Sequence, residues 1–327
     1  MNNILYKTEL GSYYIGDSQK ILTSTLKEEL LVKIQLILTS PPFPLNNKKS
    51  YGNLNGDEYK NWFISLAEIF SPLLKEDGSI VIELGNAWEP RRPVQSLLHL
   101  ESLLGFVNNP RANFRLCQEF ICYNPSRLPS PAQWVTIERI RVVDSFTRLW
   151  WMAKSDRPKA DNKKILRPYS KDMKDLLRCK KYNAGKRPSQ YDIGQTSFFK
   201  DNDGSIMHNL IELEPIKTED VRLPKNVLSI ANTKSNDFFL RTCRERDVQL
   251  HPARMPLELA NFFIDFLTDP GDIVLDPFAG SNTTGFCAER SKRKWISLEI
   301  SEKFGEQAII RFEDPLLEGD FIAYKSK

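Results

Sequence analysis

The sequence predicts an α/β protein built around a parallel sheet. One observation is an apolar run at Ile34–Thr39 that stops at two prolines, as a buried parallel strand does. Another is the helical spacing of apolar side chains in 57–74, followed by strand character in Ser79–Leu84. A strand, helix, strand order also appears between 272 and 299. Strands that alternate with helices favour a parallel sheet with helices on its faces.

The remaining regular elements follow from the same patterns. Tyr13–Ile15 is predicted as a short strand ending at Gly16, and Arg148–Lys154 as a strand rich in aromatic residues. A helix with an apolar face is expected to start at His251, with a proline in its first turn, and to stop before Gly271. The C-terminal part is then predicted to contain a strand at 272–276, a helix at 281–289 and a strand at 294–299.

The middle of the chain lacks this regularity. Between 155 and 249 prolines, asparagines and lysines are common, and no long periodic element is present. We interpret this segment as a small irregular subdomain of loops and short elements. The expected organisation is therefore 1–154, 155–249 and 250–327, in which the first and last segments together form one α/β domain.

Composition favours an ordinary soluble protein. The chain has 327 residues, of which 41% are hydrophobic and 27% charged, enough for a substantial core. No apolar run approaches the roughly 20 residues of a membrane span. The N-terminus lacks the basic start and apolar run of a signal peptide. We therefore expect a cytoplasmic protein without a membrane association.

Cysteine and histidine usage argues against a metal centre. The five cysteines are odd in number and contain no Cys-x-x-Cys pair, so reduced thiols are expected. The three histidines are scattered along the chain. Such scattered ligands do not form the spacing of a metal site, and none is predicted.

Charge is unevenly distributed along the chain. The net charge is +4, but 154–190 holds 13 Lys and Arg against 4 Asp, which leaves the rest at −5. A basic block inside a slightly acidic protein suggests a polyanionic partner such as nucleic acid. A solvated surface without a partner remains the alternative.

The stretch Ile273–Gly285 has the features of a nucleoside site. A buried strand passes into a turn of small residues and then a helix, whose free N–H groups can meet a ligand. Glu299 ends the next strand, 23 residues after Asp276, where a carboxylate can accept hydrogen bonds from ribose hydroxyls. The turn has no Gly-Lys-Ser/Thr, which argues against an NTP-binding loop.

The stretch Leu38–Phe43 indicates a site for a flat, amino-bearing substrate. Pro41 and Pro42 make the backbone rigid and leave their carbonyls free to accept hydrogen bonds. Phe43 offers an aromatic face on which a planar base can stack. A strand capped by a stiff turn, with no substrate, is the simpler interpretation.

Together, Ser40–Phe43 and Asp276–Gly285 resemble the motifs of the amino-methylating DNA methyltransferases of bacterial restriction–modification systems. Thr-Ser-Pro-Pro-Phe is similar to the N4-cytosine group, since N6-adenine members more often have Asp or Asn first and Tyr last. The catalytic motif precedes the cofactor motif, which resembles the permuted beta arrangement. Further resemblances occur in order along the chain at Tyr14–Ser18, Lys48–Gly52, Asn124–Trp134, Trp150-Trp151 and His251–Pro256.

The resemblance implies a Rossmann-like, doubly wound sheet of seven mostly parallel strands, with the strand before Ser40 next to the strand ending at Asp276. It implies methyl transfer from S-adenosylmethionine to the N4 amino group of a flipped-out cytosine in double-stranded DNA. A cognate restriction endonuclease is then implied as a functional counterpart.

The resemblance also assigns roles to residues. The catalytic candidates are Ser40, Pro41, Pro42, Phe43 and Glu83, and Glu83 either orients Ser40, accepts a proton or only holds a loop. The cofactor-binding candidates are Asp17, His251, Pro252, Asp276, Pro277, Phe278, Gly280, Ser281, Asn282, Thr283 and Glu299. The candidates for DNA contact are Lys48, Lys49, Lys163, Lys164, Arg167, Lys186 and Arg187, with Arg127, Arg139 and Arg141 as further phosphate contacts.

Three alternatives remain open at this point. The first is an N6-adenine DNA methyltransferase, and the second is an RNA or protein amine methyltransferase with a similar Pro-Pro turn. The third is a non-catalytic DNA-binding protein with a relic methyltransferase fold, against which Ser40, Asp276, Gly280 and Glu299 all argue.

Overall fold

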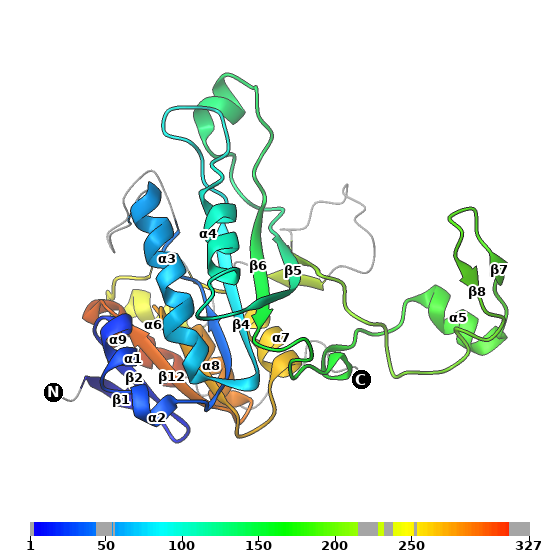
Figure 1. The fold of residues 1–327 in the computed structure, drawn as a ribbon. Helices are drawn as coiled ribbons and strands as arrows, with labels where there is room; N and C mark the ends of the chain where they lie inside the picture. The colour runs from blue at the N-terminus through cyan, green and yellow to red at the C-terminus, as the bar shows by residue number, and fades with distance from the viewer. Residues whose placement is uncertain are drawn as a thin grey trace.

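One mixed β-sheet forms the centre of the molecule (Figure 1). The structure, a computed structural model, describes residues 3–43, 54, 56–214, 228–231, 238–251 and 254–313. Within these ranges the sheet has ten strands in the order β1-β2-β12-β11-β3-β4-β6-β5-β9-β10. No helix in the described ranges has the length and apolar content needed to cross a bilayer.

Seven contiguous strands match the expected sheet. The five from β2 to β4 are parallel, and β6 runs antiparallel to both of its neighbours. Their bounds are β2 Gly11–Ile15, β12 Lys294–Glu299, β11 Ile273–Asp276, β3 Ile34–Thr39, β4 Leu74–Gly85, β6 Phe146–Ala153 and β5 Arg115–Tyr123. The predicted doubly wound α/β class is confirmed, including the adjacency of β3 and β11.

Three further strands extend the two edges. β1 (Ile4–Lys7) pairs antiparallel with β2, while β9 (Leu210–Glu214) and β10 (Leu228–Ala231) continue in parallel beyond β5. The segment expected to be irregular therefore supplies strands to the main sheet. It also supplies the 3-10 turn Asn162–Ile165, whose Ile165 is buried in the core beside α7 (Leu257–Leu267).

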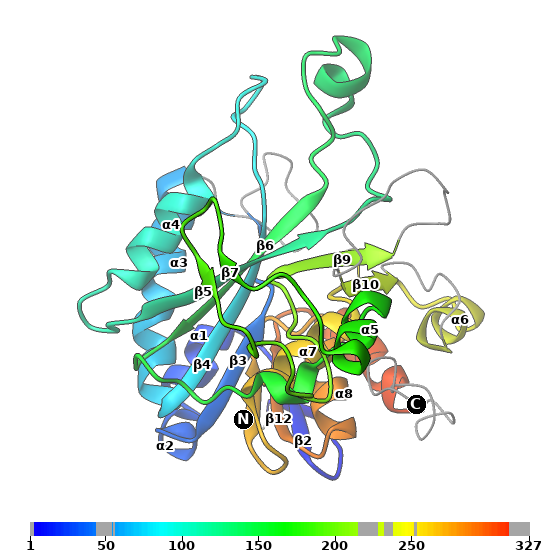
Figure 2. The same cartoon turned by 90° about the vertical axis from the view of Figure 1, so that its right-hand side faces the viewer.

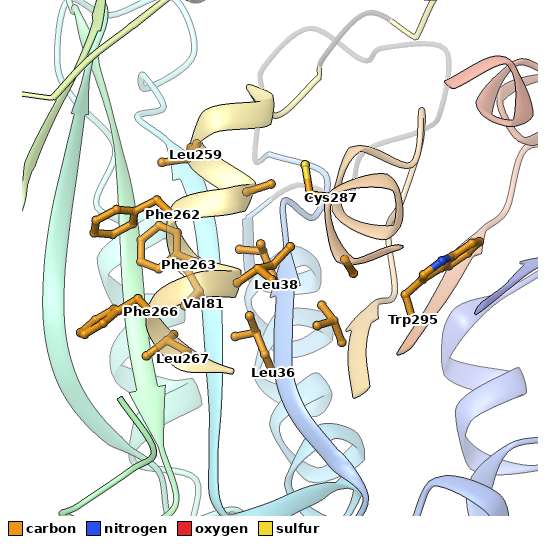
Figure 3. Close-up of a cluster of buried hydrophobic side chains, with 14 of the residues drawn as sticks. Leu36, Leu38, Val81, Leu259, Phe262, Phe263, Phe266, Leu267, Cys287 and Trp295 are labelled. Carbon is orange, nitrogen blue, oxygen red and sulfur yellow. The ribbon is translucent and has the colours of Figure 1, made fainter. Parts of the chain in front are cut away.

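Helices cover both faces of the sheet. The apolar cluster on one face joins α1 (Ser18–Thr23), α3 (Gly56–Phe70) and α4 (Leu98–Val107) to the sheet. On the other face α7 and α8 (Thr283–Arg290) pack on the central strands. Figure 3 shows this second core, with Leu36 and Leu38 of β3 beside phenylalanines of α7.

The other elements are short. They comprise α2 (Lys27–Leu30), α6 (Phe238–Glu245), α9 (Glu302–Ala308) and the turns Ser71–Leu73, Gln133–Ile137 and Ile309–Glu313. Helix α5 (Lys171–Cys179) and the two-stranded ribbon of β7 (Gly185–Lys186) and β8 (Asp192–Ile193) project together from the sheet domain (Figure 1).

Two helix boundaries differ from the sequence prediction by four or more residues, and proline explains both. Helix α3 ends at Phe70, because Pro72 cannot donate the next hydrogen bond, and β4 then begins at Leu74. Helix α7 begins at Leu257, not at His251, because Pro256 keeps the residue before it out of the helical region.

Candidate functional site

Asp276 connects the two motif turns. Its Oδ1 accepts hydrogen bonds from Thr39 Oγ1 at 2.7 Å and from the Phe278 amide at 3.1 Å, and its Oδ2 accepts one from Thr284 Oγ1 at 2.8 Å. Thr39 is the last residue of β3 and directly precedes Ser40. A single buried carboxylate therefore sets the position of the Ser-Pro-Pro turn relative to α8.

Burial changes the proton affinity of this carboxylate. Asp276 is only 5% exposed, and burial raises its pKa to about 6, since the charged form is poorly solvated there. The hydrogen bonds from Thr39 and Thr284 act in the opposite direction because they favour the ionised form. Without these donors the pKa would be higher still.

Glu299 closes the turn at Gly280. One carboxylate oxygen accepts the Gly280 amide at 3.0 Å and the other accepts the Ser301 amide at 2.9 Å. Burial raises the pKa of Glu299. The Gly280 carbonyl accepts a hydrogen bond from the Tyr13 hydroxyl at 2.7 Å. Gly280 has φ +49°, and a Cβ there would lie 3.1 Å from the His251 ring, so a larger residue would crowd the turn.

Asn282 and Ser281 form hydrogen bonds mainly with other residues of the protein. Asn282 is fully buried, caps α8 by accepting the Gly285 amide, and exchanges further hydrogen bonds with Tyr6 and Ser297. The Ser281 carbonyl accepts Arg311 Nε at 2.6 Å, and its hydroxyl accepts the same guanidinium at 3.0 Å. These contacts fix the shape of the turn.

The strand β2 brings a third segment to the same place. The Gly16 amide donates to the Glu299 carbonyl at 2.9 Å, so β2 and β12 end together. Asp17 caps α1 by accepting the amides of Gln19 and Lys20. Across the turn, the ring of Phe278 lies 5.6 Å from Trp62 of α3, centroid to centroid.

The catalytic candidates surround the end of β4. Ser40 and Phe43 are partly exposed, and Pro41 is buried. The ring of Phe43 lies over Gly85, where an added Cβ would meet it at 2.7 Å. Glu83, two residues earlier, accepts a hydrogen bond from Thr147 Oγ1 of β6 at 3.0 Å, and burial raises its pKa.

All these segments line one cavity of about 820 Å³, within the size range of ligand pockets. The candidates that line it are Asp17, Ser40, Pro41, Pro42, Phe43, Glu83, His251, Asp276, Pro277, Phe278, Gly280, Ser281, Thr283 and Glu299. Asn282 does not line it, and Pro252 lies outside the described residues.

The cavity fits a nucleoside-type ligand with polar groups. Among the described residues, Thr283 Oγ1 is buried at the start of α8 without a hydrogen-bond partner. A buried hydroxyl in this condition costs stability unless a ligand or water satisfies it. The glycine turn beside it lets a ligand approach the backbone, and Glu299 lines the cavity with a carboxylate that can accept more hydrogen bonds than the two amides supply.

Among the described DNA-contact candidates, Arg127 lines this cavity, whereas Lys163, Lys164, Arg167, Lys186 and Arg187 do not. Lys163 is exposed, whereas Lys164 donates to the Thr268 carbonyl at 2.9 Å and pairs with Asp269, which gives it a structural use. Arg167 forms a backbone bridge with Ser205, and Lys186 and Arg187 lie exposed on the β7–β8 ribbon. Lys48 and Lys49 lie outside the described residues.

Several residues of the site were not anticipated. Thr39 and Thr284 hold Asp276, Tyr13 and Arg311 hold the glycine turn, and Trp62 lines the cavity. Thr39, directly before Ser40, is part of the sequence motif, but its hydrogen-bond partner Asp276 lies 237 positions away along the chain. Within the described ranges, no group of three or more potential ligands could hold a metal ion.

The fold and the site define a class of α/β protein in which a glycine turn and a rigid Ser-Pro-Pro turn share one cavity at the ends of neighbouring parallel strands. The chain belongs to the N6/N4 DNA methylase family, whose model matches residues 34–310. It is 42% identical over 311 residues to the type II methyltransferase M.PvuII of Proteus hauseri, covering 94% of this chain and 85% of that protein. It is 23% identical over 305 residues to M.BglII of Bacillus subtilis, covering 91% and 68%.

Solved structures agree with this assignment. The PvuII DNA methyltransferase, described as cytosine-N4-specific, superposes with a TM-score of 0.71 at 35% identity and covers 96% of this chain and 90% of its own. The M1.HpyAVI–SAM complex superposes with a TM-score of 0.53 at 17% identity, covering 93% and 100%, which shows a shared fold.

Proposed function

We propose that this protein transfers a methyl group from S-adenosylmethionine to the N4 amino group of a cytosine in double-stranded DNA. The observation that carries the proposal is the shared cavity, in which Ser40 and Asp276 stand at the ends of the neighbouring strands β3 and β11. Family membership and the similarity to a cytosine-N4 enzyme support the same function.

The C-terminal turn and the end of β2 are proposed to hold S-adenosylmethionine. Asp17 accepts a hydrogen bond from the adenine amino group, Phe278 packs on the adenine, and Glu299 accepts hydrogen bonds from the ribose hydroxyls. Thr283 Oγ1 and the region of His251 then face the methionine part. When bound, S-adenosylmethionine supplies an electrophilic methyl group on a sulfonium.

The Ser40–Phe43 turn is proposed to hold the target base. An exocyclic amine is a poor nucleophile because its lone pair is delocalised into the ring. Ser40 Oγ and the Pro41 carbonyl accept hydrogen bonds from this amine, which favours sp³ geometry and exposes the lone pair. Phe43, held by its contact with Gly85, stacks on the base. Positioning supplies much of the remaining rate.

Glu83 is proposed to act beside this turn. Its carboxyl group lines the cavity, and burial raises its pKa, so its ionised form is a stronger base and can accept the proton that the amine nitrogen loses on methylation. The hydrogen bond from Thr147 keeps the side chain in place. A role limited to joining β4 and β6 is the competing assignment, and replacing Glu83 by Gln would leave turnover unchanged in that case.

The target atom is proposed to be cytosine N4 and not adenine N6. Ser at the first position and Phe at the last position of the turn support N4, as does the full-length similarity to M.PvuII. Digestion of methylated plasmid DNA and separation of the nucleosides tests this point. N4-methylcytosine is the expected product, and N6-methyladenine in its place would refute the assignment.

Segments 1–154 and 250–327 are proposed as two halves of one methyltransferase domain, and 155–249 as the target-recognition region. The projecting α5 and β7–β8 ribbon, with Lys186 and Arg187, is then available to phosphates. We further propose that the protein acts in the cytoplasm and protects DNA from a cognate restriction endonuclease.

A single substitution tests the catalytic assignment. Ser40→Ala is expected to lower turnover on duplex DNA while binding of S-adenosylmethionine, measured by calorimetry, stays near that of the wild type. Ser18→Ala, on helix α1, serves as a control for the loss of a hydroxyl at the same cavity. Unchanged turnover in Ser40→Ala would refute the role given to Ser40.

A further inference from the structure

Two loops leave the same end of the sheet and pack on each other. They are 86–97, after β4, and 124–145, between β5 and β6, and we name them together the apical lobe. The rings of Trp88 and Trp134 lie 5.9 Å apart, and the Arg141 guanidinium lies 4.4 Å from the centre of the Trp88 ring. Both loops extend well beyond the sheet in Figures 1 and 2.

The base of the apical lobe belongs to the cavity wall. Asn124 and Arg127 line the cavity on the side of Glu83, where the target base is proposed to enter. Arg127 is held there by donating to the Phe146 carbonyl at 3.0 Å. The lobe therefore rises directly from the substrate side of the site.

The outer part of the lobe exposes apolar side chains. In the loop 124–145, the most exposed are Leu128 (80%), Ile137 (68%), Ile140 (58%) and Val142 (85%). Clustered apolar side chains on a surface mark an interaction site more often than single ones do. Here they alternate with arginines, as in Arg139-Ile140-Arg141-Val142.

The charge of the lobe fits a polyanion. It carries the five arginines Arg91, Arg92, Arg127, Arg139 and Arg141 against the three acids Glu89, Glu138 and Asp144. Asp144 accepts a hydrogen bond from Asn86 Nδ2 at 2.7 Å and so also serves to join the two loops. Cationic side chains between apolar ones suit a surface that meets phosphates and bases together.

We propose that the apical lobe is a second DNA-contacting element, separate from 155–249, which stabilises the duplex with the target base extruded. This inference rests on the proposed function. A base that leaves the stack exposes the faces of its neighbours, and apolar side chains can cover them. Ile140 and Val142 contact these bases, and the exposed arginines of the lobe, Arg91, Arg92 and Arg139, contact the flanking phosphates.

The test separates base extrusion from simple binding. The variant Ile140→Ser/Val142→Ser is compared with the wild type on two duplexes that carry the recognition site mapped from cells expressing the protein. In one duplex the target cytosine is paired with guanine, and in the other it lies opposite an abasic position, which makes extrusion easier. Leu104→Ser is the matched control, because Leu104 is an apolar residue of α4, 60% exposed and outside the lobe.

The double variant is expected to lose about tenfold in kcat/KM on the paired duplex, equivalent to about 1.4 kcal/mol. Most of this loss should disappear on the abasic duplex, while affinity for S-adenosylmethionine and the activity of Leu104→Ser stay unchanged. Fluorescence of 2-aminopurine at the target position should show less extrusion by the variant.

Three results would overturn the inference. The first is an unchanged rate of the double variant, and the second is an equal loss on both duplexes. The third is a wild-type protein that sediments as a dimer and a double variant that sediments as a monomer, with the same DNA kinetics. That result would assign the lobe to protein association. A wild type that methylates neither duplex nor plasmid DNA would instead refute the proposed function itself.

Discussion

The hydrogen bond between Thr39 and Asp276 leads to a prediction about both stability and pH. Thr39→Val keeps the shape of the side chain and removes the donor at 2.7 Å from a carboxylate that is 5% exposed. A hydrogen bond to a buried charge contributes about 1.5–3 kcal/mol, whereas one between neutral groups contributes about 0.5–1.5 kcal/mol. The cost of the substitution should therefore depend on whether Asp276 is ionised.

The direction of the pH effect follows from the raised pKa. With a folded-state pKa of about 6 against an ordinary 3.8, Asp276 binds its proton more tightly when folded, and its contribution to stability is lost as pH rises through 6. At pH 8 Asp276 is ionised and Thr39→Val should cost about 2 kcal/mol, whereas at pH 5 the cost should fall to about 1 kcal/mol. Removing the donor should raise the pKa of Asp276 further.

Urea unfolding followed by tryptophan fluorescence at pH 5 and pH 8 measures this difference. Glu299 also has a raised pKa, but its effect cancels when variant and wild type are compared at the same pH. Thr39→Ser, which keeps the hydroxyl, is the control. An equal loss at both pH values would refute the reasoning, because the hydrogen bond would then be insensitive to the charge of Asp276.

Three further changes test other parts of the site. Gly85→Ala should displace the Phe43 ring, which an added Cβ would meet at 2.7 Å, and so lower turnover with little change in cofactor binding. In a protein that already carries Phe43→Leu, Gly85→Ala should lower turnover no further. Additive losses of the two substitutions would contradict this prediction. Glu299→Gln should weaken S-adenosylmethionine binding by about tenfold or more, since the side-chain amide has one oxygen and cannot accept hydrogen bonds from both the Gly280 and Ser301 amides in the same way. Calorimetry measures the affinity, with Glu302→Gln at an exposed position as the control. Equal affinities of Glu299→Gln and the wild type would exclude this role of Glu299. Arg311→Gln should also weaken cofactor binding, because Ser281 loses the donor at 2.6 Å from its carbonyl, and wild-type affinity in a folded variant would count against a positioning role.

Local patterns predicted most of the regular structure. The strands Ile34–Thr39 and Lys294–Glu299 have the predicted bounds, because continuous apolar runs between clear stop signals leave little choice of element. The helix limits near Pro72 and Pro256 were missed. At Pro72 the apolar pattern was extended past a proline that ends the helix, and at Pro256 the helix was started too early, at a preceding proline, although it begins only after Pro256.

The candidate site was also largely visible as residue types. The cavity brings together Ser40, Asp276 and Glu299, three residues that were selected from two short motifs and a strand end. Asn282 was placed among the ligand contacts, but its side chain is used inside the turn. A polar residue next to a glycine turn has the same appearance in either role.

The sequence by itself determined the α/β class, the two motifs and the kind of chemistry that they support. These depend on spacing within short segments, where side-chain type and backbone freedom act locally. Only the tertiary structure decided that Thr39 and Thr284 both donate hydrogen bonds to the Asp276 carboxylate and that the Phe43 ring packs against Gly85. It also decided that the apical lobe lies beside the cavity. Such contacts join residues far apart in the chain, and they form only because parallel strands place their carboxyl ends at one edge of the sheet.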